Sequence, residues 1–166
     1  MKRSQTLVAA LALATAAMTA AIPAAQAQTF KAGSLEIIAP HAAATRPGQM
    51  SDGGFMTIRN TGDAPDYLIG AKGAFADTLQ VHRTVVDANG VAKMLPIPEL
   101  KIPAHGEVKL EHGSYHVMMM GLKRQLTKGE AVPVTLIFKT AGEVTVEFTI
   151  DGGIMDKMKM QMKSGG

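Results

Sequence analysis

The sequence predicts an all-β protein and, more specifically, an antiparallel β-sandwich. Short runs alternate apolar and polar side chains, which is the pattern of a strand with one buried face. Clusters of Gly, Asn, Asp and Ser separate these runs, and no segment of comparable length has a helical period. About eight or nine short strands at this spacing are typical of two packed sheet layers.

The clearest element is a hairpin near the C-terminal end of the chain. Every second side chain between residues 143 and 150 is apolar, and residues 132–138 alternate in the same way. The intervening Thr140, Ala141 and Gly142 favour a turn. Further strands are expected over residues 34–38, 54–59, 66–72, 78–84, 91–95, 107–111 and 115–120.

Residues 95–103 connect two of these strands and contain three prolines. Pro96, Pro98 and Pro103 lack the backbone N–H that a strand inside a sheet must donate, so we expect an irregular or edge connection. We find no internal repeat and no interdomain linker. Residues 28–150 are therefore expected to form one domain with one core.

The N-terminus has the three parts of an export signal. Basic residues at positions 2 and 3 precede a long uncharged apolar run, and Ala25 and Ala27 are the small residues that a signal peptidase reads. We expect cleavage of residues 1–27, a periplasmic destination, and no stable membrane span afterwards. The alternative is an uncleaved membrane anchor, because residues 6–27 are nearly long enough to cross a bilayer.

Charge and cysteine content exclude several classes of function. Cleavage would leave 15 of the 17 basic residues against 14 acidic ones, so net charge would fall from +3 to +1. With no basic stripe and no aromatic platform, the sequence does not predict a nucleic-acid partner. The absence of cysteine excludes disulfides, thiolate metal sites and blue-copper electron transfer.

Four residues are the candidate metal ligands of the chain: His82, Met94, His116 and Met118. Two imidazoles and two thioethers make a soft and neutral ligand set, which suits monovalent copper better than zinc, calcium or magnesium. An imidazole binds metal only when its nitrogen is unprotonated, so binding should depend on pH. The sequence therefore predicts a Cu(I) site, and no catalytic or other cofactor-binding residues.

The alternation of residues 115–120 places two of these ligands together. In an extended strand His116 and Met118 project from one face, about 7 Å apart. Val117 and Met119 then point to the other side, where a core requires them, while the orientation of Met120 is ambiguous.

The other two ligands belong to one expected hairpin. His82 lies on the face of its strand opposite to Val81, so it too is expected to point away from the core. Residues 87–90 supply the turn, and the returning strand can bring Met94 back beside His82.

This pattern resembles the PCu(A)C family of periplasmic copper chaperones, over roughly residues 34–150. The gap between His82 and Met94 is one residue longer than is usual in the family, and Ala92 stands where many members have another Met. The segments that match are His82, Met94, His116-Val117-Met118 and the flanking residues 54–60, 100–104, 113–115 and 120–122.

The resemblance implies a cupredoxin-like Greek-key β-sandwich that binds Cu(I) through His82, Met94, His116 and Met118. It also implies a carrier rather than an enzyme. The expected client is the subunit of cytochrome c oxidase that holds the CuA centre, or another periplasmic copper carrier.

The remaining histidines are left outside the site. His105 and His112 stand in predicted turns and are expected to be solvated, and the sequence does not fix the position of His41 relative to copper. Residues 151–166 are rich in Gly, Lys and Met and are expected to form a flexible tail. Four methionines of this tail either form an auxiliary copper site or have no role: Met155, Met158, Met160 and Met162.

Two other classes of function stay open at this point. The chain could sequester copper for tolerance without a dedicated client, or it could be a structural β-sandwich that binds no metal. An enzyme is disfavoured, because the sequence has no nucleophile elbow, no Cys–His pair and no general base beside the four ligands.

Overall fold

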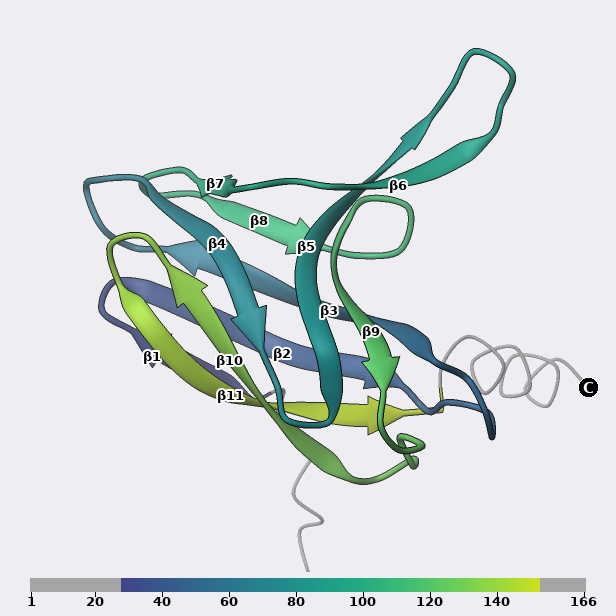
Figure 1. Ribbon diagram of the computed structural model, residues 1–166. Helices are drawn as coiled ribbons and strands as arrows, with labels where there is room; N and C mark the ends of the chain where they lie inside the picture. The colour runs from purple at the N-terminus through teal and green to yellow at the C-terminus, as the bar shows by residue number, and fades with distance from the viewer. Residues whose placement is uncertain (1–27, 153–166) are drawn as a thin grey trace, which may run out of the picture.

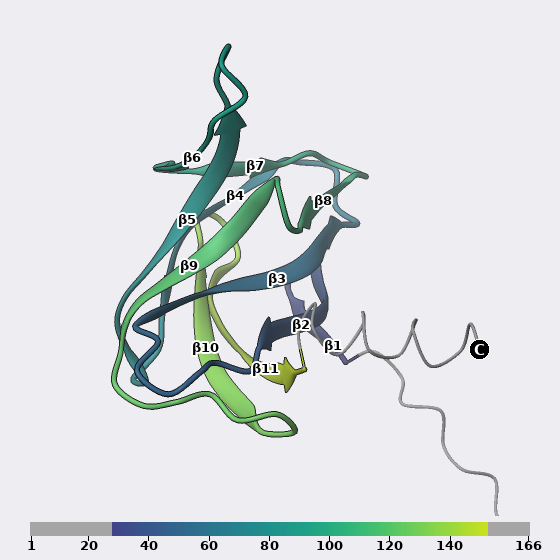
Figure 2. The ribbon, with the colours of Figure 1, turned by 90° about the vertical axis from the view of Figure 1, so that its right-hand side faces the viewer.

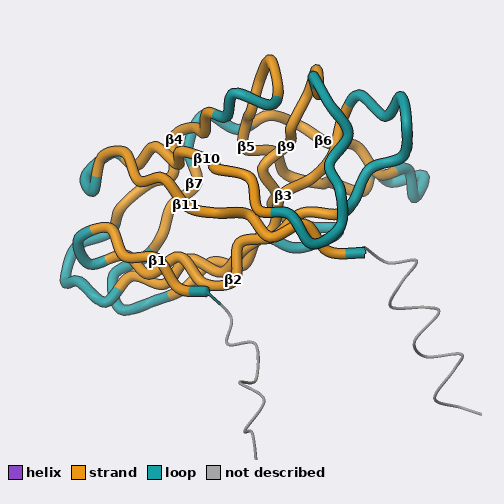
Figure 3. The backbone as a smooth tube through the Cα atoms, turned by 90° about the horizontal axis from the view of Figure 1, so that it is seen from below, coloured by secondary structure: helices purple, strands orange, loops and turns teal. Residues whose placement is uncertain are grey.

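A computed structural model describes residues 28–152 of the chain (Figure 1). Within this part every regular element is a strand (Figure 3). The strands are β1 (Thr29–Ala32), β2 (Leu35–Ala43), β3 (Ser51–Asn60), β4 (Asp66–Lys72), β5 (Ala76–Val86), β6 (Ala92–Pro96), β7 (Leu100–Ile102), β8 (Glu107–Leu110), β9 (Tyr115–Leu122), β10 (Ala131–Phe138) and β11 (Gly142–Asp151). Between residues 28 and 152 no helix is long and apolar enough to cross a membrane.

The strands form one curled sheet that closes on itself as a barrel-like β-sandwich (Figure 2). Neighbouring strands follow the order β6-β5-β9-β8-β3-β2-β11-β10-β4-β7, and β1 pairs with β2. Closure comes from a short antiparallel contact between β4 and β5, where Ala71 lies opposite Leu79. The predicted all-β sandwich is therefore confirmed, and closure leaves β6 and β7 at the ends of the strand order.

The predicted hairpin is confirmed in its register. Val134 lies opposite Val146 in the antiparallel pair of β10 and β11, as the alternation requires. Both are completely buried, and the apolar faces of the two strands supply much of the core. Burial of apolar area at about 25 cal/mol per Å² is what stabilises a domain without disulfides.

The fold differs from the expectation in three respects. β1 and β7 were not predicted as strands, although β7 is the edge connection expected from the prolines, since only β4 pairs with it. Two pairings are parallel rather than antiparallel, β11 with β2 and β8 with β9. β11 also continues to Asp151, which pairs with Ala43, so the domain extends one residue beyond 150. The expected signal (1–27) and most of the expected tail lie outside the described residues.

The β5–β6 hairpin projects from the body of the sheet as an arm (Figures 1 and 2). Its turn is closed by Asp87, whose carboxylate accepts hydrogen bonds from the backbone N–H groups of Asn89 and Val91, both 3.0 Å long. Gly90 adopts a φ of 79°, a conformation that favours glycine. All five residues of β6 are exposed. The arm is therefore ordered by its own turn rather than by packing.

Candidate metal centre

The two predicted imidazole ligands lie directly opposite each other in the middle of the sheet. β5 and β9 pair antiparallel, and their register places His82 against His116. The two ring centroids are 5.8 Å apart. Side chains of directly opposed residues share one face of a sheet, so two histidines far apart in sequence meet there.

Both rings are buried, although each side chain points away from the core. His82 is 8% exposed and His116 is 4% exposed, although each lies on the face opposite to the core residues Val81 and Val117. Phe55 explains part of this cover, because its ring centroid lies 6.4 Å from that of His116. The predicted direction of the side chains is confirmed.

Hydrogen bonds leave one nitrogen of each imidazole without a partner. His82 Nε2 lies 3.3 Å from the side-chain oxygen of Gln80, and His116 Nδ1 lies 3.4 Å from the carbonyl oxygen of Ser114. Both oxygens only accept, so each of these nitrogens must donate its proton. His82 Nδ1 and His116 Nε2 are then unprotonated, and both are buried without a hydrogen-bond partner.

Burial also keeps both rings neutral. Desolvation lowers the pKa of His82 below its usual value of 6.5, and the neighbouring charge of protonated His116 lowers it further. Desolvation likewise lowers the pKa of His116, against the raising effect of its hydrogen bond to Ser114, and His112 adds a lowering effect. At neutral pH the two bare nitrogens are therefore available as metal donors.

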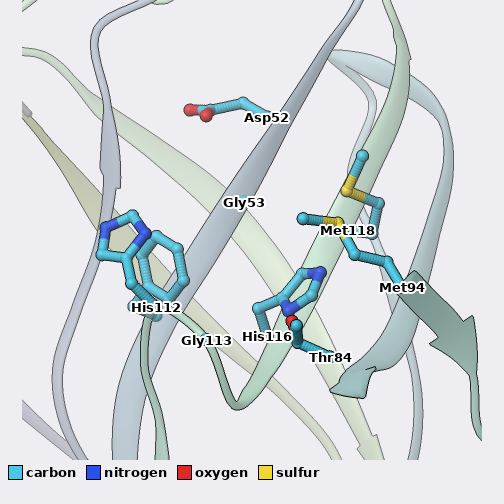
Figure 4. Close-up of a pocket in the computed structure, with 9 residues that line it drawn as sticks. Asp52, Gly53, Thr84, Met94, His112, Gly113, His116 and Met118 are labelled. Carbon is cyan, nitrogen blue, oxygen red and sulfur yellow. The ribbon is translucent and has the colours of Figure 1, made fainter. Parts of the chain in front are cut away.

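The two thioethers lie on the same side of the sheet. Met118 lies two residues beyond His116 on β9 and is partly exposed, and Met94 lies on β6 opposite Thr84 and is 57% exposed. Met94, His116 and Met118 all line one pocket of about 180 Å³, and Figure 4 shows their side chains converging there. His82 is not part of the lining, and its ring adjoins the pocket through His116.

Three further residues of the pocket were missed or undervalued in the sequence. Phe55 forms one wall, and the ring of His112 packs on it with centroids 4.0 Å apart. His112 is exposed, as expected for a turn residue, yet it lines the pocket. Asp52 lines it as well, from β3. No local pattern marks these residues, because the turn before β9 and the start of β3 meet only in the folded sheet.

The Asp52 carboxyl has an unusual environment for a surface strand. Its Oδ2 atom is buried and has no hydrogen-bond partner. Desolvation raises the pKa of Asp52, while backbone N–H groups of Gly53 and Ala43 and the charge of His112 oppose this effect, and Asp151 adds to the rise.

The other two histidines lie apart from the pocket lining. His41 Nδ1 is 2.9 Å from the carbonyl oxygen of Ala39, and its ring centroid is 5.7 Å from that of Phe55. His105 is exposed and lies 2.8 Å from a carboxylate oxygen of Asp63. His105 is thus a solvated turn residue, as predicted.

Beside Asp52 and His112, four side chains in and next to the pocket make a soft donor set. Within residues 28–152, no three side chains drawn from His, Asp and Glu form a group that could hold a metal ion. What the pocket and its border do offer is two neutral imidazole nitrogens and two thioether sulfurs. Such a set matches a monovalent soft ion. The methionines at 155, 158, 160 and 162 lie outside the described residues.

Comparisons with solved structures connect this geometry to copper-binding domains. The chain is similar to the apo PCuAC domain from PmoF1, with 25% identity, a TM-score of 0.66, and coverage of 75% of this chain and 98% of that one. The copper-bound PCuAC domain from PmoF2 gives 26% identity, a TM-score of 0.64, and coverage of 75% and 97%. CuI-DR1885 from Deinococcus radiodurans gives 35% identity, a TM-score of 0.57, and coverage of 69% and 76%.

Sequence comparisons give the family. One curated relative, named "Putative lipoprotein Lxx21020" and found in Leifsonia xyli subsp. xyli, is 33% identical over 115 residues, which are 58% of this chain and 69% of the relative. A family model for LpqE-like lipoproteins matches residues 35–150, and so spans nearly the whole described sheet. By this match the chain belongs to the LpqE-like family of lipoproteins.

Proposed function

We propose that this protein binds Cu(I) through His82, Met94, His116 and Met118. The observation that supports this most strongly is the pair of buried imidazole nitrogens that have no hydrogen-bond partner. A buried polar atom without a partner costs about 1–3 kcal/mol, and a metal bond would remove that cost. The similarity to copper-bound PmoF2 and CuI-DR1885 supports the same metal.

The chemistry of the donors favours the reduced ion. Thioethers are soft and uncharged, and divalent copper prefers harder nitrogen and oxygen donors, so two sulfurs select for Cu(I). Since His82 and His116 are already neutral at pH 7, binding there releases no proton from either ring. Ligands fixed by Gln80 and Ser114 also need little reorganisation before they bind.

We further propose that the protein carries copper rather than using it in catalysis. Met94 stands on an exposed arm, so an acceptor can approach the ion and replace this thioether first. We expect residues 1–27 to direct export and then to be cleaved, the 28–150 domain to act in the periplasm, and copper to be delivered to the CuA centre of cytochrome c oxidase. The export signal and the similarity to PCuAC domains support this location and role.

Binding is tested by anaerobic competition between the mature protein and a chromophoric Cu(I) chelator, with Zn(II) as the comparison ion. We expect one tightly held Cu(I) and much weaker zinc binding, and His116→Ala should abolish the difference. The matched control is His105→Ala, which removes an exposed imidazole away from the pocket and should leave the affinity unchanged. Equal affinity for zinc and Cu(I) would refute the proposal.

Delivery is tested in cells under copper limitation. Loss of the protein should reduce cytochrome c oxidase activity, and the wild type should restore it where His116→Ala does not. If the only consequence of loss is sensitivity to added copper, the protein sequesters copper instead of delivering it.

The methionine tail is a separate part of the proposal. We expect Met155, Met158, Met160 and Met162 to bind additional Cu(I), because a sequence this polar seldom retains four methionines for packing and thioethers are soft donors. A chain truncated after Asp151 should then bind fewer copper ions than the full mature chain. Equal stoichiometry would exclude an auxiliary site.

A further inference from the structure

Strand β9 presents a row of three soft donors on its outer face. His116, Met118 and Met120 occupy every second position, while Val117 and Met119 between them are completely buried in the core. Successive residues of a strand point to opposite faces, so the three outer side chains follow each other at about 7 Å intervals. Only the first two of these belong to the ligand set proposed above.

The residues that flank the row on β3 and β5 are small or polar. On β3 the residues opposite Met118 and Met120 are Gly53 and Ser51. On β5 the corresponding residues are Gln80 and Thr78, both exposed. The cross-strand neighbours of Met118 and Met120 are thus small or polar on both sides, and Met118 lines the pocket described above. Met120 itself is partly exposed.

Burial gives a weaker reason for a methionine at position 120 than at position 119, because Met120 is only partly buried. Methionine usually fills gaps in a core, and the adjacent Met119 does this with no exposure at all. On the outer face of an antiparallel sheet, a polar residue is the ordinary choice. A thioether in line with His116 and Met118 therefore calls for a role in metal chemistry.

The row ends one residue later. Gly121 has a φ of 66°, and a Cβ atom there would collide with the carboxylate of Asp77. The alternation stops at this position, so Met120 is the last outward donor of β9. It is also farther from the buried imidazoles than Met118, because His82 and His116 face each other at the opposite end of the row.

We propose that Met120 is a transfer ligand for Cu(I), which the ion occupies together with Met118 on its way into or out of the pocket. This inference rests on the proposed copper-binding function. In the exchange the bonds from Cu(I) to His82 Nδ1, His116 Nε2 and the Met94 sulfur break as a bond to the Met120 sulfur forms, and Met118 remains bound. No electron or proton moves, because the thioethers and the imidazoles are neutral.

Such an intermediate stage lowers the barrier to exchange. A cuprous ion leaving the imidazoles directly for solvent would lose two strong donors, whereas a two-sulfur stage keeps it coordinated throughout. Two long methionine side chains at alternate positions of one strand can bend toward a common ion between them. Weak, uncharged thioether bonds can also be replaced one at a time by an acceptor.

The direct test follows the methionine methyl groups by NMR. The full mature chain is labelled with [methyl-13C]methionine, the signals are assigned by Met→Leu variants, and Ag(I) is added as a redox-inert substitute for Cu(I). We expect the methyl signals of Met94, Met118 and Met120 to shift, and those of the buried Met56 and Met119 to stay in place.

The outcomes separate this inference from the function on which it rests. If Met94 and Met118 shift and Met120 does not, the transfer ligand is refuted and the copper site stands. If none of the three shifts, the copper site itself is refuted.

A kinetic test uses Met120→Leu, a substitution of similar volume that should cost little stability. We expect Cu(I) transfer to a chelator to slow by roughly tenfold while the equilibrium affinity stays within about twofold. The matched control is Met119→Leu, which removes a sulfur from the core face of the same strand and should not change the transfer rate. Transfer by Met120→Leu at the wild-type rate would overturn the inference.

Discussion

The imidazole pair and the thioether of Met94 are held in opposite ways by neighbouring strands. His82 and His116 lie in the centre of the sheet, are almost completely buried, and each donates one hydrogen bond that fixes its tautomer. Met94 lies on the exposed arm, where every residue of β6 is open to solvent. On one face of the protein, two imidazole ligands are thus held in fixed positions, while the thioether of Met94 is open to solvent.

This difference explains how one site can both hold and release an ion. Fixed, neutral imidazoles are prepared for binding and should supply most of the affinity, since their order has been established during folding. An exposed thioether can be displaced by a competing donor without unfolding any part of the core. Substitutions of the imidazoles and of Met94 can test this difference, beginning with the imidazoles.

Replacement of a fixed imidazole should have the largest effect. We expect His116→Ala to weaken Cu(I) binding by at least about 100-fold, because loss of a ligand should exceed the 10- to 100-fold cost of losing an outer-shell partner. The change also leaves a cavity, so some loss of stability is expected. Competition titration gives the affinity, and circular dichroism shows that the variant is folded. Wild-type affinity in a folded His116→Ala protein would contradict the ligand assignment.

Replacement of the exposed thioether should have a smaller effect. We expect Met94→Leu to weaken Cu(I) binding by roughly tenfold, about 1.4 kcal/mol, and to leave the free energy of unfolding unchanged. The side chain is 57% exposed, so nothing in the core depends on it. The same titration and a urea denaturation measure both quantities. A loss of Cu(I) affinity as large as that of His116→Ala would remove the distinction between the fixed imidazoles and the exposed thioether.

The arm can also be perturbed without touching a ligand. Gly90 has a φ of 79°, and a Cβ atom added there would meet nothing within 4 Å, so Gly90→Ala should cost about 1 kcal/mol through backbone strain alone. Because the turn positions Met94, Cu(I) affinity should fall slightly, by less than for Met94→Leu.

The matched control for this variant is Gly129→Ala. Gly129 has a φ of 91° and equally open surroundings, but it lies outside the arm. It should lose similar stability and no copper affinity. If both variants lose affinity equally, the arm does not position Met94.

The smallest expected effect is on the pH dependence of stability without metal. Burial lowers the pKa of His82 and His116 below 6.5, so above that pH both rings are neutral in the folded and the unfolded chain. As pH falls through 6.5, these two histidines become protonated in the unfolded chain but stay neutral in the native protein. The free energy of unfolding therefore decreases. The decrease ends when pH has passed the lowered native pKa values.

Urea denaturation at pH 7.5 and about pH 5.5 measures this decrease. A variant with both His82→Gln and His116→Gln should lose less stability between the two conditions than the wild type. The contribution of Asp52 is common to both proteins and cancels in the comparison. An equal loss in both proteins would show that the imidazoles are not held neutral by burial.

Local alternation was sufficient for the strands that carry the site. The face of His116 and Met118, the inward direction of Met119, and the hairpin that carries Met94 all follow from the period of two residues. These features depend on neighbours in sequence or on a single turn. Their prediction therefore required no knowledge of the whole sheet.

Features that depend on distant segments could not be predicted. The ring of Phe55 on β3 lies beside His116, and the ring of His112 before β9 packs on Phe55, and these segments meet only when the sheet curls. Asp52 reaches the pocket in the same way. The parallel pair of β11 and β2 joins strands about a hundred residues apart, and no short-range pattern marks such a pairing.

The central claim is that two buried imidazoles and two thioethers converge on one cuprous ion, and X-ray absorption at the copper edge tests it most directly. For the Cu(I)-loaded mature chain we predict a first shell of nitrogen and sulfur, with sulfur lost stepwise in Met94→Leu and Met118→Leu and nitrogen lost in His116→Ala. A first shell of nitrogen and oxygen without sulfur, unchanged by these substitutions, would contradict the account.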